Sequence, residues 1–145
     1  MTRFYAIDEA TAAIPDVERI LVALRDQRKD LITFRDRALA LTPEDGAAAE
    51  EAAEELRRIR LRMQGLIDQM QAGGARLVEM DITLRDIETG LIDFPALLAG
   101  RPIWLCWRLG ESDVQHWHAH DEGFSSRSPL DELPTGGAAG SGSPA

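Results

Sequence analysis

The amino-acid sequence predicts an α+β fold, with a long antiparallel helical hairpin over residues 15–72 and a small, mainly antiparallel C-terminal sheet over residues 80–130. Apolar residues recur every three or four positions through the first part, as at a seam between packed helices. After about Met80 the apolar period changes to two, as in half-buried strands. A chain of 145 residues suits one domain, which we place at residues 1–130. Residues 131–145 are rich in Gly, Ser and Ala, and we expect them to form a disordered tail.

The first helix of the hairpin is predicted to start at Pro15, because the first turn of a helix tolerates a residue without an N–H. Ahead of it, residues 3–7 are expected to form a short strand, and Asp8 is expected to cap a short turn that runs to Ala13. The apolar seam of this helix consists of Val17, Ile20, Leu24, Leu31, Phe34, Ala38 and Leu41.

The second helix is predicted to start at Thr42-Pro43, a capping residue followed by a first-turn proline. Its glutamates precede its arginines, an order that suits the helix dipole and lets Glu54 pair with Arg58. Gly73-Gly74 is expected to end or interrupt the helix, but Leu77 continues the register of the seam, which favours a continuation to about Met80. Its seam consists of Ala52, Leu56, Ile59, Met63, Leu66 and Met70. One hairpin cannot bury every apolar position alone, so we expect either the sheet or a second copy to cover it, which suggests a homodimer.

Several short segments with alternating or continuous apolar residues predict the strands of the sheet. Residues 82–85 and 91–94 flank the turn-forming sequence Asp86–Gly90, which indicates a β-hairpin. Ile103–Trp107 is the strongest strand prediction, and Val114–His118 is expected to form the next strand.

Composition argues against two classes of partner. The net charge is −9, and no basic cluster accompanies the aromatic C-terminal segment, so nucleic acid is not an expected partner. No apolar run approaches the roughly 20 residues of a membrane helix, and the N-terminus carries acids where a signal peptide is apolar. One cysteine cannot form an internal disulfide, which fits a reducing compartment. We therefore expect a cytoplasmic protein with no membrane partner.

Three histidines alternate near the C-terminal end of the predicted sheet. A strand would place His116, His118 and His120 on one face, with Asp121 directly after them. Imidazole is a common ligand of zinc and similar divalent metals, and three ligands would leave a position open for water, as in a metal-dependent hydrolase. A solvated strand end with polar residues explains the same pattern, and no cofactor remains the favoured expectation.

The single cysteine suggests a second catalytic arrangement. Cys106 would be the nucleophile and His118 its base, because a nearby imidazole activates a thiol. However, Cys106 lies between Leu105 and Trp107 in an apolar strand, where inert buried thiols are common. We therefore assign no catalytic residue.

Short motifs along the chain resemble those of domain-of-unknown-function family 2203, a bacterial family. These motifs are Gly90–Pro95, Cys106–Glu111, Trp117-His118, Gly123-Phe124 and Arg127, with Asp8-Glu9-Ala10 and Ile14-Pro15 near the start. The resemblance covers nearly residues 3–130 and implies a small cytosolic bacterial protein, but it brings no activity with it. It supports His118 and not clearly His116 or His120, which implies that His118 alone points inward, to Glu111 or to a backbone carbonyl.

The polar and aromatic residues of these motifs form the candidate ligand-binding set. Its members are Asp93, Trp107, Arg108, Glu111, Trp117, His118 and Arg127. In one interpretation the charged members form internal salt bridges that hold loops over the sheet. In the other they form a pocket for a small anionic ligand, with Trp107 and Trp117 as its walls.

Taken together, these patterns favour a non-enzymatic interaction or regulatory module with a small-ligand pocket, which binds a protein partner or a second copy of itself. The first alternative is the metal-dependent hydrolase that uses the three histidines. The second is an RNA polymerase-binding factor, since a long N-terminal hairpin with acids near its turn and a small β region is similar in layout to Gre-type factors.

Overall fold

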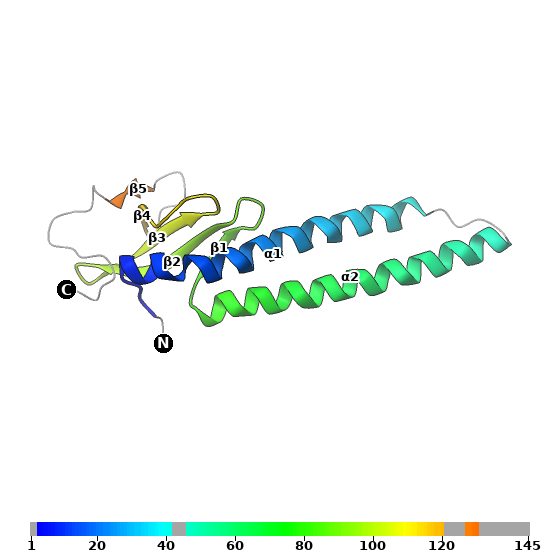
Figure 1. Ribbon diagram of the computed structural model, residues 1–145, viewed down its shortest axis with the longest axis horizontal. Helices are drawn as coiled ribbons and strands as arrows, with labels where there is room; N and C mark the ends of the chain where they lie inside the picture. The colour runs from blue at the N-terminus through cyan, green and yellow to red at the C-terminus, as the bar shows by residue number, and fades with distance from the viewer. Residues whose placement is uncertain (1–2, 42–45, 121–126, 131–145) are drawn as a thin grey trace. The chain divides into compact units, whose positions relative to one another are not determined.

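The computed structural model describes residues 3–41, 46–120 and 127–130 (Figure 1). Two long helices that pack as a hairpin precede an antiparallel sheet, so the predicted α+β class is confirmed. The elements are α1 (Ile7–Ala40), α2 (Ala47–Glu79), β1 (Thr83–Asp86), β2 (Leu91–Leu98), β3 (Arg101–Arg108), β4 (His116–Ala119) and β5 (Ser128–Pro129). The chain divides into two compact units: residues 1–22 with 75–145, here called the sheet unit, and residues 23–74, here called the hairpin unit.

In the hairpin unit, the two helices meet along the predicted apolar seam. Leu24 and Ile59 are buried, whereas the other predicted seam residues of this unit are half-buried. At the edge of the seam Arg37 binds the carboxylate of Glu55 at 2.6 Å. The predicted pairing of Glu54 with Arg58 is confirmed, with 3.6 Å between the nearest nitrogen and oxygen.

The start of α1 differs from the prediction. Residues 3–6 form no strand, and α1 begins at Ile7, so Asp8 lies inside the first turn rather than before it. The Asp8 carboxylate accepts a hydrogen bond from the Glu9 N–H at 3.0 Å, and the Glu9 carboxylate accepts one from the Ala6 N–H at 2.8 Å. The helix then continues through Pro15. Proline removes one backbone donor and crowds the preceding turn. That cost is offset because apolar residues on both sides of Pro15 are buried in the sheet unit: Ala10, Ile14, Val17 and Leu21. Leu21 takes the buried position that the seam assigned to Ile20.

Helix α2 runs through Gly73-Gly74 and ends at Glu79, so these glycines do not end it, and the continuation to about Met80 that the position of Leu77 predicted is confirmed. Each glycine costs a helix about 1 kcal/mol relative to alanine, and burial of Leu77 at 1% exposure anchors the turn that follows. The helix ends in a Schellman motif, in which the Ile82 N–H donates to the Leu77 carbonyl and the Asp81 N–H to the Val78 carbonyl. The predicted start of this helix at residues 42–43 lies outside the described residues.

The sheet is a meander of five antiparallel strands in the order β1-β2-β3-β4-β5. The predicted hairpin of residues 82–94 and the predicted strand Ile103–Trp107 are confirmed as β1–β2 and β3. The strand predicted at Val114–His118 forms two residues later, as β4, while β5 was not predicted.

Strand β2 continues through Pro95 to Leu98, whereas the predicted strand ended at residue 94. Pairing with β1 extends only to Asp93, so no strand needs a hydrogen bond from residue 95 on that side. The Pro95 carbonyl, which points the same way, instead accepts a bond from the Tyr5 N–H at 2.7 Å. The N-terminal segment therefore takes the place of β1 along this part of β2.

One face of the sheet carries the core of the sheet unit. Phe94, Leu105 and Trp107 lie on this face and are fully buried, while Asp93 and Cys106 lie on the opposite face among apolar residues such as Leu91 and Trp104. The ring of Tyr5 meets that of Phe94 edge-on, with centroids 4.9 Å apart.

No helix in the described part of the chain is long and apolar enough to cross a membrane. The tail predicted at residues 131–145 lies outside the described residues.

Candidate functional site

The sheet separates the predicted site residues onto two faces. Residues opposite each other in an antiparallel pair share a face, and the register pairs Asp93 with Cys106 and Cys106 with His116. Trp107 pairs with Ile92, which places Trp107 on the opposite, apolar face. Trp117 pairs with Leu105 and belongs to that apolar face as well. The two tryptophans therefore do not wall a pocket around the polar residues.

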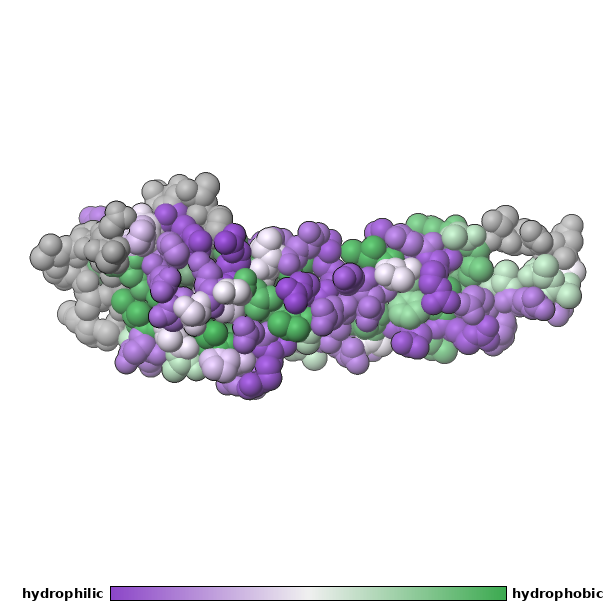
Figure 2. Space-filling view, turned by 45° about the horizontal axis from the view of Figure 1, so that its top comes forward, coloured by the Kyte–Doolittle hydropathy of each residue, from purple (hydrophilic) through white to green (hydrophobic). Residues whose placement is uncertain are grey.

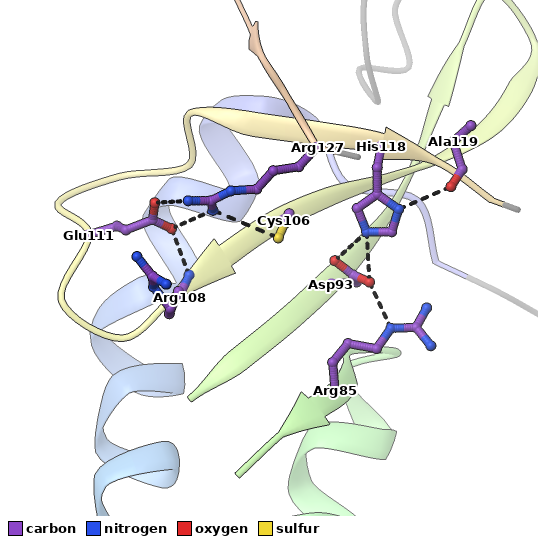
Figure 3. A network of polar contacts seen from close by, with 8 residues as sticks. All are labelled: Arg85, Asp93, Cys106, Arg108, Glu111, His118, Ala119 and Arg127. Carbon is purple, nitrogen blue, oxygen red and sulfur yellow. Dashed lines mark hydrogen bonds and ion pairs between the residues drawn. The ribbon is translucent and has the colours of Figure 1, made fainter. Parts of the chain in front are cut away.

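The polar face contains a buried network centred on Asp93 (Figure 3). The carboxylate is 1% exposed and accepts a hydrogen bond from Nε of Arg85 at 2.7 Å. Nε2 of His118 lies 3.0 Å from each carboxylate oxygen. Because a buried carboxylate is costly unless it is paired, the contacts with Arg85 and His118 account for its position.

The imidazole of His118 is held at both nitrogens. Nδ1 lies 3.0 Å from the carbonyl oxygen of Ala119, which can only accept a hydrogen bond, so Nδ1 carries a proton. Nε2 faces the Asp93 carboxylate, and an ionised carboxylate also only accepts. Both ring nitrogens therefore face hydrogen-bond acceptors. The inward position of His118, 3% exposed and bonded to a backbone carbonyl, agrees with what the family resemblance implied.

Cys106 lies beside this network but is not activated by it. Burial, with the nearby Asp93 carboxylate as the second cause, raises the pKa of the Cys106 thiol to about 12, despite Arg127 4.0 Å from its sulfur. Both nitrogens of His118 are already engaged, so neither is free to take the thiol proton. Cys106 is therefore an unreactive thiol in this arrangement.

A second polar cluster holds the loop between β3 and β4. The Glu111 carboxylate accepts a hydrogen bond from the Arg108 N–H at 2.8 Å and pairs with both terminal nitrogens of Arg127, at 3.1 and 3.3 Å. The Glu111 carbonyl accepts the indole N–H of Trp107 at 3.1 Å. These contacts match the internal salt-bridge interpretation, in which Glu111 joins the loop to the segment that precedes β5.

The three histidines do not converge on one point in the described structure. Nδ1 of His116 lies 3.6 Å from Glu111, too far for a hydrogen bond. His120 stacks on the Trp104 ring with centroids 4.3 Å apart, and only His118 enters the Asp93 network. Asp121, the fourth predicted metal ligand, lies outside the described residues. In the described part of the chain, the group with ligand atoms within 4.8 Å of one another is Asp93, Cys106 and His118.

The sheet unit also has two open hollows at its surface. One, of about 480 Å³, is lined by Leu98, Arg101, Pro102, Ile103, Trp117, Ala119 and His120. The other, of about 320 Å³, is lined by Val114, Gln115, His116, Pro129 and Leu130. Of the seven residues in the predicted ligand set, Trp117 alone lines either hollow.

The predicted site lacked Arg85, which belongs to the polar network, and Trp104, whose ring contacts Arg85. Arg85 gave no local signal, although the predicted hairpin of residues 82–94 places it across from the Asp93 region. Trp104, on which both Arg85 and His120 stack, was assigned only to the strand. Strand register, more than residue type, identifies such partners.

The comparisons with known proteins identify a family but no relative of known activity. Neither the curated proteins nor the solved structures include a match to this chain. The family model of the uncharacterized conserved proteins DUF2203 matches residues 3–130, which include the sheet, both polar clusters and both helices. The chain therefore belongs to the DUF2203 family.

Proposed function

We propose that this protein is a non-enzymatic interaction module that associates with a second copy of itself through the hairpin unit. The proposal rests on one observation above all. Within residues 23–41 and 46–74, Leu24 and Ile59 are the only buried side chains. A seam that stays half-buried along two long helices is the kind of surface that further helices cover in a four-helix bundle.

The half-buried seam is the apolar surface that supports the proposal. Its members on α2 other than Ile59 are all partly exposed: Ala52, Leu56, Met63, Leu66 and Met70. Figure 2 shows hydrophobic surface interrupted by hydrophilic surface along the helices. Covering half-buried leucine and methionine side chains would stabilise an assembly by about 25 cal/mol for each Å² removed from water.

Charge on α2 favours a second copy as the partner. Glu51, Glu55, Arg58 and Arg62 follow one another at spacings of four, three and four, so they lie on one face of the helix. Two of them flank the seam, since Glu55 pairs with Arg37 and Arg62 lies over the Phe34 ring at 5.2 Å. Two copies of α2 placed antiparallel about a twofold axis between residues 56 and 57 would set Glu51 opposite Arg62 and Glu55 opposite Arg58. The face is self-complementary, as a twofold interface requires.

In this proposal the apolar seam supplies the stability and the charges set the register. Exposed ion pairs contribute little stability by themselves, whereas charges beside an apolar seam determine partner and orientation in coiled coils. The sheet unit would remain outside the interface, and its Glu111 cluster and Asp93 network would keep the roles already described.

Charge reversal tests the proposal. The wild-type chain should elute with a light-scattering mass twice its 16.0 kDa. The double variant Glu51→Arg/Glu55→Arg should shift towards monomer, as should Arg58→Glu/Arg62→Glu, because each places like charges together. Mixing the two variants should restore a dimer that contains both. Circular dichroism would confirm that each variant remains helical.

Asp26→Arg/Asp30→Arg is the matched control, because it reverses two exposed carboxylates on α1 away from this face. It should leave the dimer intact. A wild-type chain that is monomeric at all accessible concentrations would refute the proposal. A dimer that persists in both charge-reversal double variants would refute the assignment of the interface to this face of α2.

A further inference from the structure

We propose that Asp93, Cys106 and His118 form a binding site for zinc or a similar divalent transition metal in the sheet unit. The three residues come from β2, β3 and β4, which are neighbours in the sheet (Figure 3). One ligand atom from each lies within 4.8 Å of the other two. This site differs from the three-histidine cluster that the sequence suggested and shares only His118 with it.

The donor types suit zinc. Thiolate sulfur, imidazole nitrogen and carboxylate oxygen are its usual protein ligands, and this mixed set is poorly suited to magnesium or calcium, which prefer oxygen alone. Around a tetrahedral zinc with ordinary bond lengths, ligand atoms lie roughly 3.3–3.6 Å apart. The present separations, 3.0 Å between His118 and Asp93 and at most 4.8 Å overall, require side-chain shifts of about an ångström.

Each donor already has an outer partner of the kind that supports metal ligands. A metal-bound histidine commonly donates its second ring N–H to a backbone carbonyl, and Nδ1 of His118 faces the Ala119 carbonyl at 3.0 Å. Arg85 holds the Asp93 carboxylate at 2.7 Å. Arg127 lies 4.0 Å from the Cys106 sulfur, where it can stabilise a thiolate. The three ligands are thus held in position by contacts with residues outside the donor set.

Burial makes the donor set specific. Asp93 and Cys106 are each 1% exposed and His118 is 3% exposed, so the ligands are held by packing on all sides. Charge is also compatible, because the Asp93 carboxylate and a Cys106 thiolate would together offset the two positive charges of a divalent cation. Metal ligands bind in their deprotonated form, so binding would release protons.

Three protein ligands leave one coordination position, which an exogenous water would occupy. The proposal stops at binding and assigns no reaction. It is independent of the proposed self-association, because all three ligands belong to the sheet unit.

The test uses the full chain without an affinity tag, stripped with a chelator and then titrated with Zn²⁺ and Co²⁺ alone. We expect about one ion per chain, as a single donor set implies. The cobalt form should show the near-ultraviolet sulfur-to-cobalt charge-transfer band that reports a thiolate ligand. Cys106→Ser, which is nearly isosteric and should fold, should lose that band and most of the affinity. Asp93→Asn should also lose affinity.

His116→Ala and His120→Ala are matched controls, because both histidines lie near the site without contributing to the donor set. They should retain stoichiometric metal and the charge-transfer band. Absence of metal binding by the wild-type chain would overturn the proposal. Binding without the sulfur band, or binding lost in the His116 or His120 variant, would also overturn it.

Discussion

The sheet unit and the hairpin unit bury their side chains to very different depths. In the sheet unit, Phe94, Leu105 and Trp107 are fully buried, and the polar residue Asp93 is almost equally enclosed. In the hairpin unit, the described seam residues other than Leu24 and Ile59 stay half-buried. The sheet unit therefore completes its own core, whereas the hairpin unit leaves apolar surface for another helix to cover.

Charged residues differ between the units in the same way. The ion pair of Asp93 with His118 is inaccessible to solvent, and both partners are fixed by further hydrogen bonds. The pairs of the hairpin unit, such as Glu54 with Arg57 and Arg58, are mostly exposed. Buried pairs are costly to break, and exposed ones contribute little. Substitutions should therefore have larger effects in the sheet unit.

A matched pair of leucine substitutions gives the largest expected contrast. Leu105→Ala removes a fully buried side chain and should lower the free energy of unfolding by about 3–5 kcal/mol. Leu56→Ala, at a half-buried seam position, should cost only about 1–2 kcal/mol. Denaturant titration can follow the units separately, because all three tryptophans belong to the sheet unit while circular dichroism reports the helices. Equal losses at both positions would contradict the contrast in burial.

Two histidines in one short segment test the buried network. His118→Ala should destabilise the sheet unit by about 2–3 kcal/mol, because Asp93 keeps Arg85 but loses its charged hydrogen bond to the ring. His120→Ala removes an exposed ring stacked on Trp104 and should cost less than about 1 kcal/mol. Tryptophan fluorescence during urea unfolding would measure both. A larger loss for His120 would show that the network does not stabilise the sheet.

Alkaline pH should weaken the sheet unit through Cys106. The folded state raises the pKa of this thiol from 9.0 to about 12. The contribution of the protonated thiol to the free energy of unfolding is therefore fully present below pH 9 and is lost as the pH rises towards 12. At pH 10 the loss should be about 1.4 kcal/mol, the equivalent of one pKa unit. Cys106→Ser, which does not titrate, should lose less stability between pH 8 and pH 10 in chelator-treated protein. Burial also raises the pKa of Tyr5, but it acts equally in both proteins. Parallel curves for the two would refute the assignment to Cys106.

The sequence by itself determined the class of fold and most of its elements. Apolar spacing of three and four along residues 15–72 is a local property, and so is the change to a period of two after Met80. The turn Asp86–Gly90 was likewise predicted from its residue types. The structure shows why glycine ends it: Gly90 has a positive φ of 68°, and a Cβ at this position would lie 2.6 Å from that of Leu109. The motifs of Gly90–Pro95 and Cys106–Glu111 indicated the family.

Tertiary structure alone decided the element ends and the polar partners. Pro15, Gly73-Gly74 and Pro95 are local breaking signals. Burial of neighbouring residues outweighs them in the two helices, and at Pro95 the pairing of β2 with β1 has already ended at Asp93. The pairing of Asp93 with His118 depends on strand register across 25 positions of sequence, and no local pattern encodes that register. A shift of one residue in the pairing would turn His118 to the opposite face of the sheet. Residue types alone therefore suggested a cluster of three histidines, whereas the strand register places only His118 beside Asp93 and Cys106.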